Sequence, residues 1–188
     1  MTAVDIPDVL GLCGSLREGS YTHRALKIAL AAAQRAGAAT GLLAGAALRL
    51  PLCDGRPPAA YPPEVLDLRE RARRADALLL ASPEYCGTLS AVLKNALEWL
   101  SPDILRGKLI GVLAVAEGPS ATGALQALQQ IGWAQGAWVL PVAASAPLAP
   151  HLFLHPDSAL AHQVRCQLEQ LGAALPEAVC RLRREGKQ

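Results

Sequence analysis

The sequence is poor in charged and aromatic residues, and it contains no long hydrophobic run. Charged residues make up 18% of the 188 positions and aromatic residues 4%, and the formal net charge is only +2. A charge so close to zero argues against a nucleic-acid partner, for which a strongly basic surface is expected. The apolar runs, such as Ile110–Ala116, fall short of the roughly 18 residues that a membrane-spanning helix needs. We therefore expect neither a nucleic-acid nor a membrane partner.

Cysteine pairs and metal-binding patterns are also missing. The five cysteines form no Cys-x-x-Cys pair, and the N-terminus lacks the basic and apolar regions of a signal peptide. This pattern predicts a cytoplasmic protein. His151 and His155 would face each other only in a helix, and Pro150 and Pro156 disfavour a helix there. We therefore expect no metal site.

The sequence instead alternates short apolar runs with segments of helical periodicity. The apolar runs predict strands at Leu10–Cys13, Thr40–Ala44, Ala77–Ala81, Lys108–Val115 and Ala137–Val142. The intervening and closing segments predict helices at Tyr21–Ala36, Pro63–Arg74, Ser90–Leu100, Ala124–Gln135 and Ala159–Arg184, the last broken or bent at Pro176. Prolines predict a long loop at Leu48–Pro63 and an irregular segment at His151–Asp157. Together these elements predict one α/β domain, residues 1–188, with a parallel sheet covered by helices on both faces.

Three of the predicted strands are followed by loops rich in Gly, Ser, Thr and Pro, at residues 14–20, 82–88 and 116–123. Ligands of open α/β sheets bind beyond the carboxyl ends of the strands, at the point where the strand order reverses. With a strand order of 2-1-3-4-5, the first two loops flank that point and the third lies beside it. The sequence therefore predicts one ligand site built from the three loops.

The first loop has the composition of an anion site. Gly14 lets the backbone turn tightly, Ser15 and Ser20 supply hydroxyl donors, and Arg17 supplies a cation. The helix that begins near Tyr21 directs the positive end of its dipole at the same place. Because the loop contains neither Gly-x-Gly-x-x-Gly nor a terminal Gly-Lys-Ser/Thr, a monophosphate fits better than a pyrophosphate or a triphosphate. The alternative is an ordinary strand-to-helix turn in which Ser20 caps the helix.

Two motifs carry a family resemblance. The first loop is Gly14-Ser-Leu-Arg-Glu-Gly-Ser20, and the second is Pro83-Glu-Tyr-Cys-Gly-Thr88, followed by Leu93-Lys-Asn-Ala-Leu-Glu-Trp99. With these motifs the chain resembles the NADPH-dependent flavin reductases of flavodoxin-like fold and their quinone, chromate and azo-compound reductase relatives. The resemblance extends over nearly the full length in element order, and it implies a flavodoxin-like doubly wound sheet of five parallel strands.

The resemblance implies a non-covalently bound FMN, with its phosphate on the first loop and its ring on the backbone of the second. Tyr85 either packs near the ring or supports the loop. The chain departs from the family at Thr22 and Cys86, which stand where the family has Asn, and Pro119 stiffens the third loop. The hydroxyl of Thr22 can still donate to phosphate, whereas Cys86 lacks an amide that could bond the flavin. The implied cofactor-binding residues are Gly14, Ser15, Leu16, Arg17, Ser20, Thr22, Pro83, Glu84, Tyr85, Cys86, Gly87, Glu117 and Gly118.

The expected function is that of an FMN-dependent NAD(P)H oxidoreductase. Hydride would pass from NADPH or NADH to FMN and on to a small-molecule electron acceptor, which is a flavin, a quinone, an azo compound or a metal oxyanion. The alternatives are a flavodoxin-type electron-transfer carrier and a non-catalytic flavin-binding domain. The resemblance also implies a homodimer or homotetramer, with Trp99 as an interface residue. Lys94 and Asn95 are expected to orient the second loop rather than take part in chemistry.

Overall fold

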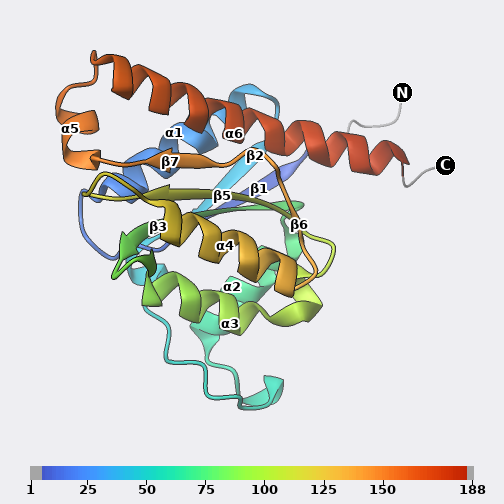
Figure 1. The fold of residues 1–188 in the computed structure, drawn as a ribbon. Helices are drawn as coiled ribbons and strands as arrows, with labels where there is room; N and C mark the ends of the chain where they lie inside the picture. The colour runs from blue at the N-terminus through green and yellow to red at the C-terminus, as the bar shows by residue number, and fades with distance from the viewer. Residues whose placement is uncertain (1–5, 186–188) are drawn as a thin grey trace.

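A parallel β-sheet separates two layers of helices (Figure 1). The computed structural model describes residues 6–185. The strands are β1 Asp8–Cys13, β2 Ala39–Leu43, β3 Ala77–Tyr85, β4 Thr88–Leu89, β5 Leu109–Val115, β6 Trp138–Val139 and β7 Ala144–Ala146. The helices are α1 Tyr21–Arg35, α2 Pro63–Arg74, α3 Ala91–Leu105, α4 Thr122–Ala134, α5 Ala149–Leu154 and α6 Ala159–Glu185, with short 3₁₀ turns at Gly45–Leu48 and Pro58–Ala60.

The strand order is β2-β1-β3-β5-β6, with β7 also paired to β5 and every pair among these strands parallel. This order confirms the predicted flavodoxin-like sheet. The fifth predicted strand, Ala137–Val142, is correct only at Trp138–Val139, which form β6 and pair with the start of β5. The strand that pairs with the end of β5 is β7, which begins at Ala144, beyond the predicted range. Pro141 lies between β6 and β7, and a proline has no N–H to continue the ladder.

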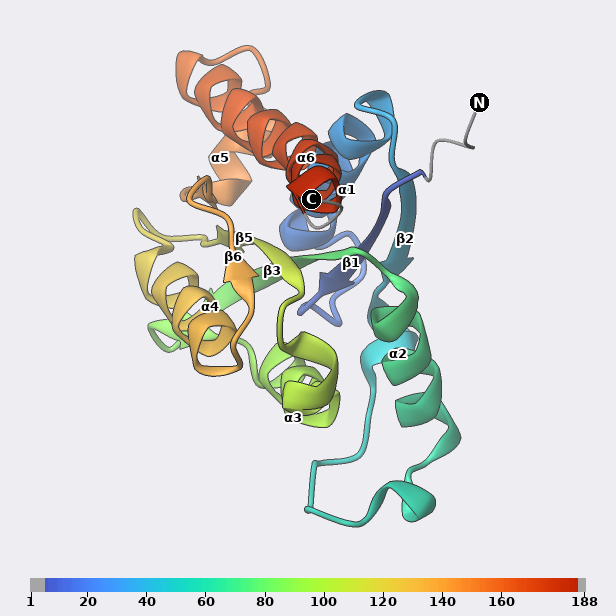
Figure 2. The ribbon, with the colours of Figure 1, turned by 90° about the vertical axis from the view of Figure 1, so that its right-hand side faces the viewer.

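Helices α1, α5 and α6 cover one face of the sheet, and α2, α3 and α4 cover the other (Figure 2). Successive side chains of the central strand β3 point to opposite faces of the sheet and so enter the two hydrophobic cores in turn. Leu79 belongs to the core under α1 and α6, whereas Leu78 and Leu80 belong to the core under α2 and α3. Burying each such leucine contributes about 1.5–3 kcal/mol. The continuous apolar run is therefore what a strand covered on both faces requires.

Several elements extend beyond their predicted bounds. The second loop is largely regular, because β3 continues to Tyr85 and turns into the antiparallel strand β4. Helix α3 passes Leu100 and ends at Leu105, with Pro102 inside it. Helix α6 is continuous through Pro176, which is buried, so the predicted break there is wrong. Its packing along α1 compensates for the one backbone hydrogen bond that a proline removes.

The segment predicted to be irregular at His151–Asp157 begins inside a helix. Pro150 lies in the first turn of α5, where its missing N–H has no intrahelical partner to lose, so it does not prevent the helix. The rings of His151 and His155 consequently face each other, with 4.7 Å between their centroids. Among residues 6–185 no group of three His, Cys, Asp or Glu side chains is arranged to hold a metal ion.

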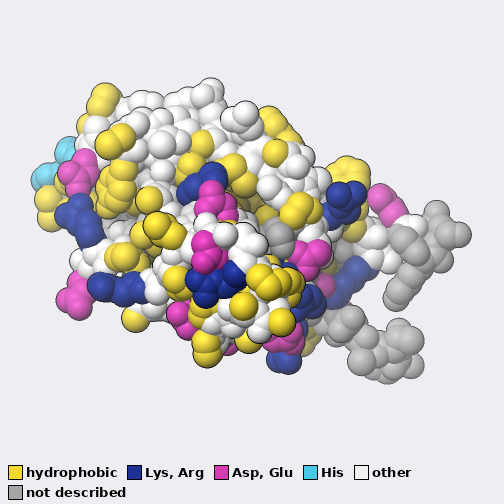
Figure 3. Space-filling view, turned by 90° about the horizontal axis from the view of Figure 1, so that it is seen from below, with side chains coloured by type: hydrophobic (Ala, Val, Ile, Leu, Met, Phe, Trp, Pro, Cys, Tyr) yellow, Lys and Arg dark blue, Asp and Glu magenta, His cyan; other side chains and the backbone are white. Residues whose placement is uncertain are grey.

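The face of the molecule seen from below mixes hydrophobic side chains with charged side chains of both signs (Figure 3). Helix α2 contributes exposed ion pairs of Glu70 with Arg73 and Arg74. Exposed pairs of this kind contribute about 0–1 kcal/mol each to stability. None of the helices within residues 6–185 has the length and apolarity needed to cross a membrane.

Candidate functional site

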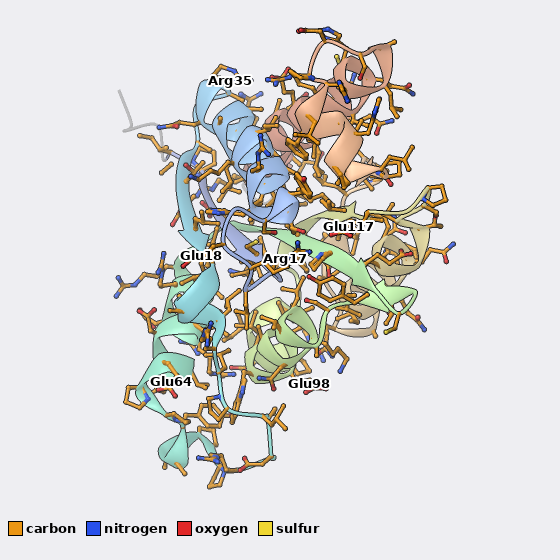
Figure 4. The ribbon with its side chains drawn as sticks, turned by 90° about the vertical axis from the view of Figure 1, so that its left-hand side faces the viewer. Arg17, Glu18, Arg35, Glu64, Glu98 and Glu117 are labelled. Carbon is orange, nitrogen blue, oxygen red and sulfur yellow. The ribbon has the colours of Figure 1, made fainter. Side chains whose placement is uncertain are left out.

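A cavity of about 650 Å³ lies where the carboxyl ends of β1, β3 and β5 meet the three predicted loops. Figure 4 shows Arg17 and Glu117 pointing toward each other in this region, from the first and third loops. The predicted site residues in its wall are Ser15, Arg17, Ser20, Thr22, Pro83, Glu84, Tyr85, Gly87, Glu117 and Gly118. Gly14, Leu16 and Cys86 are not part of the wall.

The first loop places three buried hydroxyl groups at the start of α1. Ser20 caps the helix, because its Oγ accepts the N–H of Thr22 at 3.2 Å, and Ser15 Oγ accepts the N–H of Arg17 at 3.4 Å. Ser15, Ser20 and Thr22 are all buried. Within residues 6–185 the Ser15 and Ser20 hydroxyls donate to no protein group, so both donors remain available in the cavity wall. Together with the helix N-terminus they form a cradle suited to an anion, and Ser20 performs the capping role as well.

Arg17 and Glu117 connect the first and third loops across the cavity. A guanidinium nitrogen of Arg17 donates to a carboxylate oxygen of Glu117 at 2.9 Å, and the two side chains are 66% and 63% exposed. The carboxylate of Glu117, and after it the hydroxyl of Tyr85, raise the pKa of Arg17 above its usual value. Arg17 thus lies in the cavity wall, and its cation is shared with a carboxylate.

The second loop is a hairpin docked on helix α4. A carboxylate oxygen of Glu84 accepts the N–H of Ala124 in the first turn of α4 at 2.9 Å. A Cβ added to Gly123 would lie 2.0 Å from the carbonyl oxygen of Gly87, so only glycine permits this contact. The hairpin backbone that forms part of the cavity wall is therefore fixed by α4.

Cys86 belongs to the turn of this hairpin. Tyr85 pairs with Thr88, which leaves Cys86 and Gly87 as a two-residue connection with φ values of +51° and +75°. Two-residue hairpin turns with both φ values positive favour Asn-Gly. Cys86 is exposed and outside the cavity wall. The replacement of asparagine by cysteine therefore affects the conformation of the turn. The position of Cys86 does not support a side-chain contact with a ligand in the cavity, so it does not support the predicted loss of such a contact.

Gly14 lies beneath the cavity, where a hydrogen-bonded floor joins the first two loops. The N–H of Gly14 donates to Ala81, and Ser90 Oγ donates to the carbonyl of Gly14, both at 2.7 Å. The N–H of Ser90 donates in turn to Ser82 Oγ at 2.9 Å. A Cβ on Gly14 would lie 2.7 Å from Ser90 Oγ and 2.9 Å from the Cβ of Leu93. The glycine is thus required by protein packing rather than by a bound group.

The cavity wall includes several residues that sequence reasoning missed. Arg24 lies one turn after Ser20 on α1, a spacing that places two helical residues on one face and could have revealed it. Ala149 comes from α5, an element that the sequence did not predict. Tyr21 stacks on Phe153 of α5, with 5.3 Å between ring centroids. The remaining residues of the wall are Glu18, Gly19, Val115, Ala116, Pro119 and Ser120.

Two residues of α3, Asn95 and Trp99, hold the proline-rich loop rather than the hairpin. Asn95 accepts the N–H of Cys53 and donates to the carbonyl of Pro51, both at 2.9 Å, and Trp99 Nε1 donates to the same carbonyl at 2.8 Å. Trp99 is only 2% exposed. Its predicted place at a subunit interface is therefore wrong, because its own chain covers it. Lys94 forms an exposed ion pair with Glu98.

Residues 7–150 match the model of a protein family described as NADPH-dependent FMN reductase. The chain is 36% identical over 129 residues to an NAD(P)H-dependent FMN reductase of Pseudomonas aeruginosa, a match that covers 63% of this chain and 64% of that protein. It is 33% identical over 138 residues to an NAD(P)H:quinone oxidoreductase of Solanum tuberosum, with 70% of each chain covered.

Among solved structures, the fold is similar to that of the flavoenzyme NAD(P)H:(acceptor) oxidoreductase FerB from Paracoccus denitrificans. The TM-score is 0.76 at 21% sequence identity, and the match covers 94% of this chain and 98% of the other. At this identity the likeness concerns the fold alone.

Proposed function

This chain belongs to the NADPH-dependent FMN reductase family, and we propose that it is an oxidoreductase that holds FMN in the cavity at the carboxyl ends of β1, β3 and β5. Electrons pass from NADPH or NADH to a small-molecule acceptor. The names of its relatives support a flavin or a quinone as that acceptor, and azo compounds and metal oxyanions belong to the same proposal.

The observation that carries the proposal is the composition of the cavity. Its volume of about 650 Å³ lies within the range of 300–1,000 Å³ that is usual for cofactor pockets. Ser15, Ser20 and Thr22 supply buried hydroxyl groups at the N-terminus of α1. Helix N-termini are favourable binding sites for phosphate groups in general. The hairpin supplies backbone and an aromatic side chain, Tyr85, on the opposite side. The residues present therefore fit a ligand with a phosphate at one end and a flat ring at the other.

Bound FMN supplies a ring that takes up hydride from a nicotinamide, so the protein itself needs no nucleophile. The residues of this chain bind and orient. Ser15, Ser20 and Thr22 hold the phosphate, and the backbone of Pro83–Gly87 supports the ring. Glu84 accepts the N–H of Ala124, so it helps to keep the hairpin in place against α4. Arg17 lies at the rim in an ion pair with Glu117, so it would have to exchange this carboxylate for an anionic nucleotide in order to bind one.

The test is to purify the protein, saturate it with FMN and add NADPH or NADH without oxygen while following flavin absorbance near 450 nm, which is roughly where oxidised flavin absorbs. Rapid bleaching is the expected result. A bound flavin that neither nucleotide reduces would indicate an electron carrier instead. Failure to bind added FMN would contradict the proposal that the cavity holds this cofactor.

The same proposal includes a cytoplasmic protein whose single domain, residues 1–188, self-associates as a homodimer or homotetramer. Exposed aromatic side chains support self-association, since Trp133 and Trp138 are each 63% exposed. Light scattering coupled to size exclusion measures the mass directly. The expected value is two or four times the chain mass of 19.7 kDa, and a mass equal to that of one chain contradicts this part of the proposal.

A further inference from the structure

A second, smaller hollow lies between α1, α5 and α6, on the face of the sheet where these helices lie together (Figure 2). Its volume is about 160 Å³. Leu152, Val164 and Leu168 are buried and Ile28 is half-buried, and they give the hollow an apolar lining from all three helices. The function proposed above makes no use of this hollow.

The charged residues in the wall of this hollow are two arginines, Arg24 and Arg165. No ion pair involves either of them within the described part of the chain, and no carboxylate belongs to the wall. The guanidinium of Arg24 lies over the ring of Phe153, 4.6 Å from its centroid, so a cation–π contact orients it at the edge of the hollow. The hollow therefore combines an apolar interior with uncompensated positive charge.

Size and charge together define a class of ligand. An apolar cavity of about 150 Å³ accommodates a benzene ring, and the planar guanidinium of arginine matches a carboxylate in two parallel hydrogen bonds. We propose that this hollow is a binding site for a small aromatic monocarboxylate. The ring occupies the apolar interior, and the carboxylate meets Arg24 and Arg165 at the edge.

The site is separate from the FMN cavity but adjacent to it. Arg24 lies in the wall of both, and the stacked pair of Tyr21 and Phe153 stands beside it. Arg165 and the α6 side chains belong to the second hollow alone. The proposal does not depend on the FMN proposal, because Arg24 is the only residue that both use and the ligand is different.

The experiment measures benzoate binding to the full-length protein by calorimetry, with and without a saturating excess of FMN. Benzamide, which has the same shape without the charge, is the comparison ligand. Arg165→Gln removes one cation from the edge of the hollow. Arg181→Gln makes the same change elsewhere on α6, where Arg181 is exposed and pairs with Glu177, so it is the matched control.

We expect benzoate to bind more tightly than benzamide, and Arg165→Gln to weaken benzoate about tenfold, as for loss of one charged hydrogen-bonded contact. Arg181→Gln should leave the affinity unchanged. Ala161→Leu adds volume to a buried wall residue and should abolish binding of both ligands. Equal affinity for benzoate and benzamide, no effect of Arg165→Gln, or displacement of benzoate by FMN would each overturn the assignment.

Discussion

Single side chains in the first loop combine a structural role with a hydrogen-bond donor that is available to a ligand. Ser20 caps α1 with its oxygen lone pair and keeps its hydroxyl hydrogen available to the cavity. Ser20 is therefore compatible with both interpretations of the loop, an ordinary helix cap and an anion site. A test of the anion site needs a measured quantity that does not change when only the helix cap is lost.

The ratio of FMN to riboflavin affinity is such a measurement, because the ligands differ only in the phosphate. Ser20→Ala should lower this ratio at least tenfold, the effect of one hydrogen bond to a charged group, whereas the loss of the cap affects both ligands alike. Ser120→Ala changes a serine in the opposite wall and should leave the ratio unchanged. Fluorescence titration of each variant gives both affinities. Equal losses for the two ligands would mean that the phosphate lies elsewhere.

Cys86 allows a prediction about stability at the same scale. A non-glycine residue with φ near +51° is strained by about 1 kcal/mol or more, and asparagine tolerates this conformation better than cysteine. Cys86→Asn should therefore raise the free energy of unfolding by up to about 1 kcal/mol in urea denaturation. Cys166→Asn, an exposed position inside α6, is the control and should give no increase. A gain at Cys166 equal to that at Cys86 would contradict the turn argument.

At the scale of elements, the contact between α4 and the hairpin determines the shape of the cavity. Gly123→Ala places a methyl group against the carbonyl of Gly87, a backbone atom that moves only if the hairpin moves. Gly118→Ala, in the loop that precedes α4, has no atom within 4 Å of the added carbon. We expect Gly123→Ala to weaken FMN binding at least tenfold and to destabilise the protein by about 1–3 kcal/mol. Flavin titration and urea unfolding measure the two effects of Gly123→Ala. Gly118→Ala serves as the control for stability alone and should not destabilise the protein, and equal destabilisation by the two changes would refute the packing argument.

The elements also show which features a sequence can predict. Runs such as Leu78–Leu80 are buried on both faces, so their composition alone indicates the central strands. The convergence of the loops follows from the strand order, which is why the first and second loops were placed correctly. The contact of Trp99 with Pro51 and that of Glu84 with α4 join residues 40 or more positions apart, and no local pattern encodes such pairs. The sequence did not predict α5, because a proline in the first turn of a helix, such as Pro150, cannot be distinguished by sequence from a proline that breaks a helix.

At the scale of the whole molecule, the proline-rich segment between β2 and α2 extends away from the packed body (Figure 2). It is anchored to α3 at both ends. Asn95 binds the backbone at Pro51 and Cys53, and Tyr61 packs edge-on against Trp99 with 5.2 Å between ring centroids. Leu52, between the anchored positions, is 79% exposed. The segment is thus fixed near its ends and accessible along its length.

Limited proteolysis tests this arrangement. Chymotrypsin should cut the native protein first after Leu52. Asn95→Ala should accelerate this cut about tenfold, because it removes the hydrogen bonds that hold the backbone at Leu50, Pro51 and Cys53. Lys94→Ala, an exposed neighbour on the same helix, should leave the rate unchanged. Mass spectrometry of the fragments identifies the site. A first cut elsewhere in residues 6–185, or equal rates for both variants, would contradict the anchoring.

The floor formed by Gly14, Ser82 and Ser90 has a consequence for the energetics of the proposed cofactor. The hydrogen bonds of this floor join the first loop to the second, so the two proposed half-sites, one for the phosphate and one for the ring, are held at a fixed spacing. If FMN binds as proposed, it would act as a bivalent ligand on a preformed bivalent site, so that binding of one end would present the other at a high effective concentration. The affinity for the joined molecule should exceed what separate phosphate and riboflavin achieve together, by a chelate effect that originates in three residues beneath the cavity.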